Sequence, residues 1–276
     1  MDADLAALVW LLLEARLPLI VAAAGRRVGK STVLESMLDF LPPGTRRIDL
    51  AGEFESLAWL PEAGQLGGWS PEPGGPVPAD ALTFRIQGIN VSPSSAYLVA
   101  AELSDHLPIY TWGARARTVL RATTIGYGVG ATIHADRLEE VHTALKSPRV
   151  GLSDDELSFL GVVLVLRPTD VGRRVVAAHY ARPVVRDGHG HVQRLPPAVL
   201  AAWDERSDTL EHFSWGITPE LAGRTGRKAG DFERELTARA GYLAGLAEAG
   251  LMAVEGVRAA IDGYRTAAGA ATHHPN

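Results

Sequence analysis

The segment AAAGRRVGKST, residues 22–32, has the residue types of a phosphate-binding loop. It comes close to the pattern G-x-x-x-x-G-K-[ST], although Ala24 stands where the first glycine usually does. In such a loop, backbone N–H groups surround the phosphates, the lysine reaches the β- and γ-phosphates, and the hydroxyl binds Mg²⁺. The spacing predicts a nucleotide site whose members are Gly25, Arg26, Arg27, Val28, Gly29, Lys30, Ser31 and Thr32.

The alternative for this segment is an ordinary strand-to-helix turn that carries a surface lysine. The flanking residues favour the phosphate loop. An apolar run at 18–21 precedes the segment and a helical pattern at 33–41 follows it. This strand, loop and helix order is the context that the motif requires.

Three further polar residues lie at the ends of apolar runs downstream of the loop. Glu53 follows the run at 46–50, Glu102 ends YLVAAEL and His134 ends VGATIHA. Ligands of open α/β sheets gather at the carboxyl ends of the strands, so we expect these side chains near the phosphate loop. Nucleotide hydrolysis needs carboxylates at the metal and at the attacking water. Taken singly, each residue could instead be a loop charge, an ion-pair partner or a strand-end histidine.

The elements that would position these residues alternate along the chain. Apolar runs typical of strands alternate with helical patterns as far as residue 166, which predicts an α/β fold with a mostly parallel sheet. The runs that follow, 173–185 and the residues after the DGHG turn, favour antiparallel strands. Beyond about residue 200, Ala-rich helical runs follow one another without a strand between them. We therefore predict an α/β domain at 1–196 and a small helical domain at 197–276.

Composition excludes several classes of protein and site. The net charge of -5 disfavours a generally basic nucleic-acid binder, and the absence of cysteine excludes disulfides and thiolate sites. The apolar N-terminal stretch is interrupted by Glu14, Arg16 and Pro18, so it is too short for a membrane span. It begins with MDADL, which is acidic where a signal peptide would be basic. We expect a soluble protein.

The ordered set of motifs resembles one family, the secretion-motor ATPases of type II and type IV secretion, type IV pili and archaella. Its Walker A loop, Asp box, Walker B strand and His box look like AGRRVGKS, IDLAGEF, AYLVAAEL and GYGVGATIHA. The tail that begins GITPELAGR is similar to the C-terminal helices of the archaellum and archaeal pilus branch. The resemblance covers about residues 5–266 and implies a RecA-like P-loop NTPase fold.

The resemblance also implies roles for individual residues. Lys30 and Ser31 would bind the phosphates of ATP and Mg²⁺, with Thr32 beside them. Glu53 matches the Asp-box glutamate that orients or deprotonates the attacking water. Glu102 matches the Walker B glutamate, which holds Mg²⁺ through a water molecule. His134 matches the His-box histidine that senses the γ-phosphate.

Partners and location follow from the same resemblance. It implies a homo-oligomer, in this family a hexamer, or a mixed ring with a longer related ATPase. It also implies an integral membrane platform protein of a pilus or secretion system, and a cytoplasmic protein recruited to the inner face of the cell membrane. Nucleic acid would enter only indirectly, if DNA is the cargo.

Departures from the family pattern leave two hypotheses open. Leu50, Ala101 and Tyr127 replace an aspartate, a glycine and a histidine of the boxes, and residues 89–97 lack the arginine usual before the Walker B strand. We also expect the family's N-terminal domain to be absent. The first hypothesis is a Mg²⁺-dependent ATPase motor subunit, weak when alone. The second is a degenerate nucleotide-binding or inactive subunit with a structural or regulatory role.

Overall fold

The structure is a computed structural model that describes residues 1–25, 27–57, 59–60, 92–170, 172–186, 189, 191–251 and 253–271, with side chains to residue 267. The predictions for Arg26 and for most of the DGHG turn lie outside these residues. No helix in the described part of the chain is both long and apolar enough to cross a bilayer.

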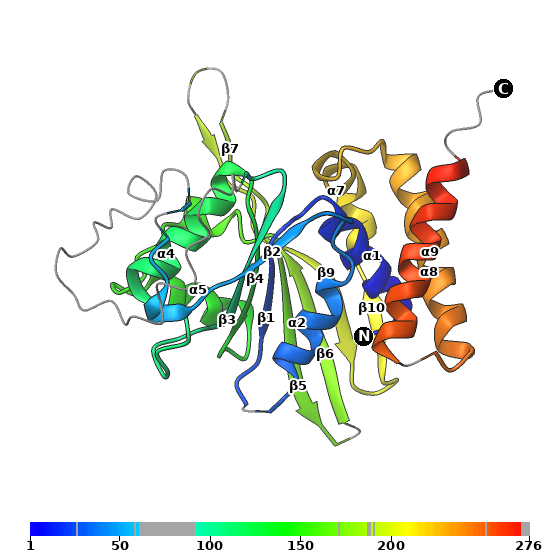
Figure 1. Cartoon of the computed structure of the whole chain (residues 1–276), viewed down its shortest axis with the longest axis horizontal. Coiled ribbons are helices and arrows are strands. Elements are labelled where there is room, and N and C mark those ends of the chain that lie inside the picture. The colour runs from blue at the N-terminus through cyan, green and yellow to red at the C-terminus, as the bar shows by residue number, and fades with distance from the viewer. Residues whose placement is uncertain are drawn as a thin grey trace.

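An eight-stranded sheet forms the centre of the molecule, in the order β10-β9-β6-β5-β1-β4-β3-β2 (Figure 1). The five strands from β5 to β2 pair in parallel, and β6, β9 and β10 extend the sheet with antiparallel pairs. The strands are β1 Leu19–Ala22, β2 Arg46–Asp49, β3 Ala96–Leu103, β4 Gly128–Ile133, β5 Val162–Thr169, β6 Gly172–Tyr180, β9 Ala198–Asp204 and β10 Thr209–His212. The predicted α/β fold is confirmed, and the order β5-β1-β4-β3-β2 is that of a RecA-like domain.

Helices cover both faces of this sheet and enclose two apolar cores. One face carries α1 Ala3–Glu14, α2 Lys30–Leu38, α7 Thr218–Arg224, α8 Ala229–Glu248 and α9 Val254–Ala271. The other face carries α4 Gly113–Arg121, α5 Leu138–Lys146 and the single turn α6 Asp154–Leu157. Strand β1 is buried throughout because Leu19 and Val21 point into the first core and Ile20 into the second. A continuous apolar run is what a strand covered on both faces requires.

Local elements connect these strands and helices. Ser153 and Glu156 form a capping box at the start of α6. A two-stranded hairpin, β7 Val185–Arg186 with β8 Val192–Gln193, flanks the DGHG segment as expected. The short elements η1 Gly52–Phe54, η3 Ala122–Ile125 and η4 Ser214–Ile217 are 3₁₀ turns.

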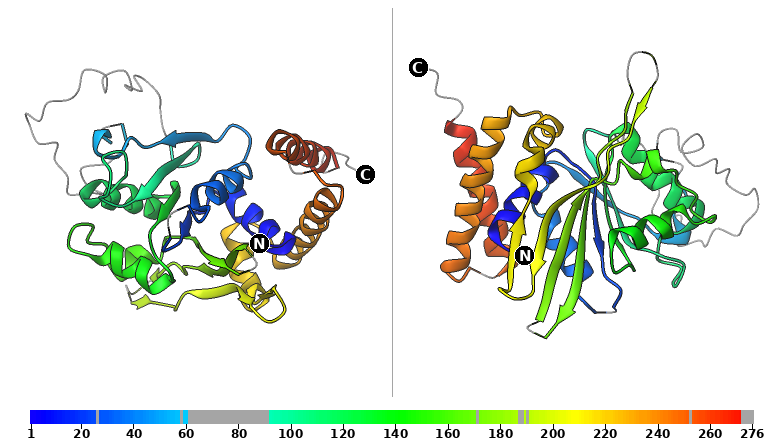
Figure 2. Two further views of the ribbon diagram at one scale, coloured as in Figure 1. Left: turned by 90° about the horizontal axis from the view of Figure 1, so that it is seen from below. Right: turned by 180° about the vertical axis from the view of Figure 1, so that it is seen from behind.

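The expectation that the chain turns helical at residue 197 needs correction. Strands β9 and β10 follow that point and join the main sheet, since β9 pairs with β6. Helices begin only with η4 and α7, and α8 packs against α1, side by side in Figures 1 and 2. Tyr264 of α9 makes an edge-to-face contact with Trp10 of α1. The sequence of β9, AVLAAWD, has apolar residues on both faces of the strand, so apolar and polar residues alternate only weakly along it. A strand pattern and a helix pattern are therefore hard to tell apart in this segment. A division into two domains stays a proposal, with its helical part at 218–271.

Candidate nucleotide-binding site

The segment that connects β1 to α2 adopts a tight turn of the kind a phosphate loop needs. Arg27 and Gly29 have positive φ angles of 58° and 101°, and the Val28 side chain between them is buried. A Cβ atom on Gly25 would lie 2.6 Å from Cγ2 of Val28, so the absence of a side chain at 25 lets the turn close over that valine. The backbone thus folds back on itself before α2 begins.

Helix α2 begins at Lys30, with Gly29 as its N-cap. The N–H groups of the first turn, those of Lys30, Ser31 and Thr32, have no acceptor within the helix. With the helix dipole, they favour an anion at this position. Ser31 and Thr32 are exposed, so a hydroxyl oxygen is accessible beside the lysine.

A lysine and a carboxylate meet above the central strands. Nζ of Lys30 lies 3.6 Å from Oε2 of Glu102, and the two side chains are 10% and 18% exposed. Glu102 comes from β3, two strands away from β1, so the lysine reaches across the end of β4. The pair offers a cation for phosphate and an oxygen ligand for a hard metal ion such as Mg²⁺. The predicted association of Lys30 and Glu102 is present in the structure.

An irregularity in β3 sets the direction of Glu102. The pairing of β3 with β4 shifts register between Ala100 and Leu103. Oγ1 of Thr132 donates to the carbonyl oxygen of Ala101 at 2.6 Å, and N of Thr111 donates to that of Glu102 at 3.0 Å. Bulges of this kind re-aim a side chain at the end of a strand.

His134 lies beside the start of the connection between β1 and α2. Strand β4 ends at Ile133, which pairs with Ala22, and N of Ala23 donates to the carbonyl oxygen of Ile133 at 3.2 Å. The next residue, His134, is therefore beside the first residues of the loop, with an exposed side chain. Tyr127 stands at the opposite end of β4 and is buried, and burial raises the pKa of its hydroxyl.

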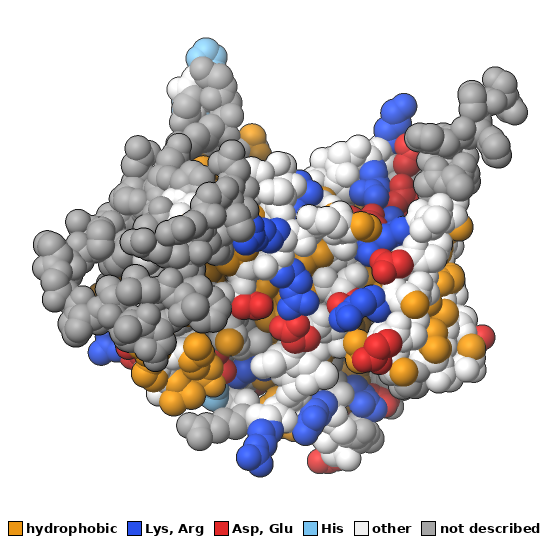
Figure 3. All heavy atoms as spheres, viewed as in Figure 1, with side chains coloured by type: hydrophobic (Ala, Val, Ile, Leu, Met, Phe, Trp, Pro, Cys, Tyr) orange, Lys and Arg blue, Asp and Glu red, His pale blue; other side chains and the backbone are white. Residues whose placement is uncertain are grey.

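Glu53 is the predicted residue that the structure does not bring to this pair. It sits on η1 after the edge strand β2, where its N–H donates to the carbonyl oxygen of Pro108 at 2.7 Å. Its side chain is exposed, and among the described residues no contact joins it to Lys30 or Glu102. Exposed apolar side chains, Phe54, Leu107 and Ile109, flank it, and Figure 3 shows orange side chains gathered toward the lower left.

A further basic side chain, which the motifs did not predict, lies at the loop. A Cβ atom on Gly29 would be 3.8 Å from Cδ of Arg173, which belongs to β6. No sequence signal marks this residue, because its position depends on how far the hairpin of β5 and β6 extends past β1.

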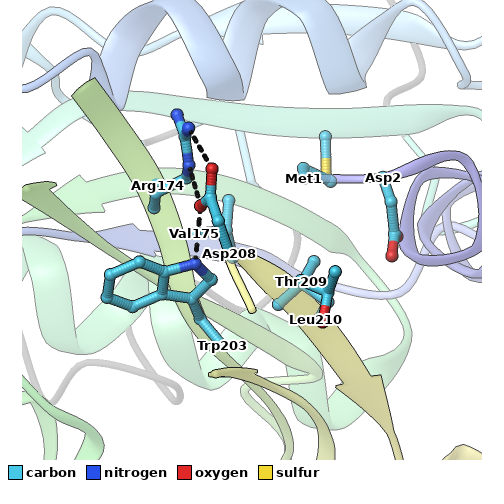
Figure 4. Close-up of a pocket in the computed structure, with 8 residues that line it drawn as sticks. All are labelled: Met1, Asp2, Arg174, Val175, Trp203, Asp208, Thr209 and Leu210. Carbon is cyan, nitrogen blue, oxygen red and sulfur yellow. Dashed lines mark hydrogen bonds and ion pairs between the residues drawn. The ribbon is translucent and has the colours of Figure 1, made fainter. Parts of the chain in front are cut away.

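A separate open cavity of about 330 Å³ lies near the N-terminus (Figure 4). Arg174 donates two hydrogen bonds of 2.8 Å to Asp208 there, and Nε1 of Trp203 donates a third to the same carboxylate. The hydrogen bonds from Arg174, followed by that from Trp203, lower the pKa of Asp208 to about 2. None of the predicted site residues lines this cavity. Its lining is Met1, Asp2, Arg174, Val175, Trp203, Asp208, Thr209 and Leu210.

Comparison with known proteins adds little to this geometry. No protein-family model matches the chain, and no curated protein matches it. Among the solved structures that it resembles is the VirB11 ATPase from the Brucella suis type IV secretion system in complex with sulphate, with a TM-score of 0.37 and 18% sequence identity. The match covers 62% of this chain and 50% of that chain. A likeness this distant carries no argument about activity, and the assignment of the fold rests on the order of the strands.

Proposed function

We propose that the chain binds ATP with Mg²⁺ in the loop 25–32 and hydrolyses it to ADP and phosphate. The observation that carries this proposal is the contact between Lys30 and Glu102 at the end of the parallel strands, directly beside the loop. The lysine at the start of α2 and the carboxylate near the end of β3 converge beside the loop, which an ordinary strand-to-helix turn does not require.

The residues present fit the proposed ligands. The first-turn N–H groups of α2 and the ammonium of Lys30 would hold the phosphates. The hydroxyl of Ser31 and, through a water molecule, the carboxylate of Glu102 would hold Mg²⁺, which prefers oxygen ligands and retains several waters. Bound Mg²⁺ would neutralise charge on the phosphate oxygens. Lys30 would exchange its contact with Glu102 for one with phosphate.

Two other residues would complete the chemistry. Glu53 would orient or deprotonate the attacking water, which requires η1 to approach the pair when nucleotide binds. His134, beside the start of the loop, would register the γ-phosphate and pass its loss to the next element.

At the level of the assembly, we propose a motor subunit of a secretion or pilus machine, in a homo-oligomeric or mixed ring at the inner face of the membrane. A membrane platform protein would be its partner.

One observation favours the second candidate function, a nucleotide-binding subunit that does not hydrolyse. Glu53 is exposed on the edge of the sheet and makes no contact with Lys30 or Glu102 in the described part of the chain. Such a protein would bind ATP and turn it over slowly or not at all.

The test is nucleotide binding by calorimetry beside Mg²⁺-dependent phosphate release, each over a range of protein concentrations. We expect Lys30→Ala to weaken ATP binding about a hundredfold, since a lost charge-assisted contact costs about 1.5–3 kcal/mol. Lys146→Ala is the matched control, because that lysine pairs with Asp154 on the surface. Glu102→Gln should retain binding and lose hydrolysis.

The outcomes separate the two candidates. Hydrolysis that rises with protein concentration and disappears in both site variants supports an assembled ATPase. Binding that is lost in Lys30→Ala, with no turnover at any concentration, supports the non-hydrolysing subunit. Absence of ATP binding by the unaltered protein would exclude both functions.

A further inference from the structure

The hairpin formed by β5 and β6 extends past the phosphate loop. Ala22, the last residue of β1, pairs with Val165, but β5 continues to Thr169 before the chain returns as β6. Oγ1 of Thr169 donates to the carbonyl oxygen of Gly172 at 2.8 Å across the turn. Figures 1 and 2 show the tip of this hairpin beside the connection between β1 and α2. The residues at its tip therefore lie next to the loop.

Arg173 is the basic residue that this geometry brings to the loop. Its Cδ atom is 3.8 Å from the position that a Cβ atom on Gly29 would occupy. Residues two apart in a strand point to the same face, and Val175 belongs to the core beneath α1 and α2. The side chain of Arg173 thus leaves the sheet on the side where α2 begins, and its guanidinium lies beyond Cδ.

The two neighbouring arginines of this hairpin, Arg167 and Arg174, are paired with carboxylates, whereas Arg173 has no such partner among the described residues. Arg167 pairs with Asp136 and Arg174 with Asp208. For Arg173, no ion pair or side-chain hydrogen bond occurs within the residues that the structure describes, and its side chain is exposed. A guanidinium carries five N–H donors in a planar fork that matches phosphate oxygens.

We propose that Arg173 binds the phosphate chain of the nucleotide held in the loop 25–32 of the same chain. This inference rests on the proposed function, because it requires a nucleotide in that loop. The guanidinium would donate hydrogen bonds to phosphate oxygens from the side of the hairpin, while Lys30 contacts them from α2. Arg173, on a strand outside the sequence motifs, would then supply part of the positive charge that phosphoryl transfer needs, from within the same subunit.

The experiment compares the affinities of ATPγS and ADP, by calorimetry with Mg²⁺, for the unaltered protein, Arg173→Ala, Arg173→Lys and Arg174→Ala. Arg174→Ala is the matched control, because it removes the same side chain from the adjacent residue, whose partner is Asp208. Circular dichroism verifies that each variant is folded, and the exposure of Arg173 predicts that it is.

We expect Arg173→Ala to weaken binding of at least one nucleotide by about tenfold or more, which corresponds to about 1.4 kcal/mol. Arg173→Lys should retain part of the affinity, and Arg174→Ala should remain within about twofold of the unaltered protein. A loss confined to ATPγS would assign the contact to the terminal phosphate, and a loss for both nucleotides to the α- or β-phosphate that they share.

The inference and the proposed function fail differently. If Arg173→Ala binds both nucleotides like the unaltered protein while Lys30→Ala does not bind, the loop is a nucleotide site and the inference about Arg173 is wrong. If Arg174→Ala weakens binding as much as Arg173→Ala, the effect is a general loss of charge and the inference also fails. If the unaltered protein binds neither nucleotide, both are wrong.

Discussion

Replacement of Glu14 by glutamine tests how the C-terminal helices are held to helix α1 and the sheet beneath it. Oε2 of Glu14 accepts from Nη2 of Arg239 at 2.7 Å and from Nη2 of Arg227 at 3.2 Å. Oε1 lies 3.5 Å from Nε of Arg265 and accepts from Nε1 of Trp10 at 2.8 Å. Glutamine keeps an oxygen for Trp10 but removes the charge that three arginines share.

The expected cost follows from the surroundings of this carboxylate. Glu14 is 16% exposed and Arg239 is 8% exposed, so water compensates little for the lost charge. A charge-assisted hydrogen bond contributes about 1 kcal/mol more than a neutral one, which gives about 3 kcal/mol for the three hydrogen bonds that Arg239, Arg227 and Trp10 donate to this carboxylate. Glu235 still contacts both of these arginines. For a chain of this size, about 3 kcal/mol lowers the melting temperature by roughly 6–12 °C.

The assay is thermal and urea unfolding of Glu14→Gln beside Glu35→Gln. Glu35 accepts from Nη2 of Arg47 at 2.5 Å, but these side chains are 55% and 32% exposed. Exposed ion pairs contribute about 0–1 kcal/mol, so the control should barely change the unfolding free energy. An equal and small effect of the two substitutions would refute the idea that the Glu14 cluster anchors the C-terminal helices.

Three further predictions concern single positions. Burial, followed by repulsion from Lys146, lowers the pKa of His142 below 6.5, so the folded state binds fewer protons than the unfolded state and the unfolding free energy falls as the pH drops below that value. Between urea titrations at about pH 7.5 and about pH 5.5, His142→Gln should therefore lose less stability than the unaltered protein. An equal loss in the two proteins would contradict this assignment. Gly25→Ala places a Cβ atom 2.6 Å from Cγ2 of Val28, so calorimetry should give about tenfold weaker ATP binding with an unchanged melting temperature; unchanged affinity would show that the turn adapts. Gly52 has a φ angle of 62°, and a Cβ atom there would lie 2.3 Å from the carbonyl carbon of Ile109. Gly52→Ala should therefore lower the unfolding free energy in urea by about 2–3 kcal/mol. No change in that free energy would mean that the 3₁₀ turn can shift to accept the methyl group.

The local pattern of the sequence was sufficient for the elements that carry the site. Three local signals predict the elements around the loop. The apolar run before AAAGRRVGKST predicts β1, the glycines in AAAGRRVGKST predict the tight turn, and the helical pattern after it predicts α2. Each signal depends only on residues that are close in the chain. The same holds for the ends of β3 and β4, where Glu102 and His134 stand. Since parallel strands align their carboxyl ends, those residues were expected on the same side of the sheet as the loop.

Only the tertiary structure decided which of these residues meet. The order β1-β4-β3-β2 brings Glu102 within reach of Lys30 and leaves Glu53 at the edge, and that order depends on contacts between distant segments. Strands β9 and β10 were missed because their weak alternation is resolved only by pairing with β6. Arg173 reaches the loop because β5 runs four residues past its last pairing with β1, up to Thr169. Which strands pair, and how far each extends past its neighbour, depends on contacts between segments that are distant in the chain.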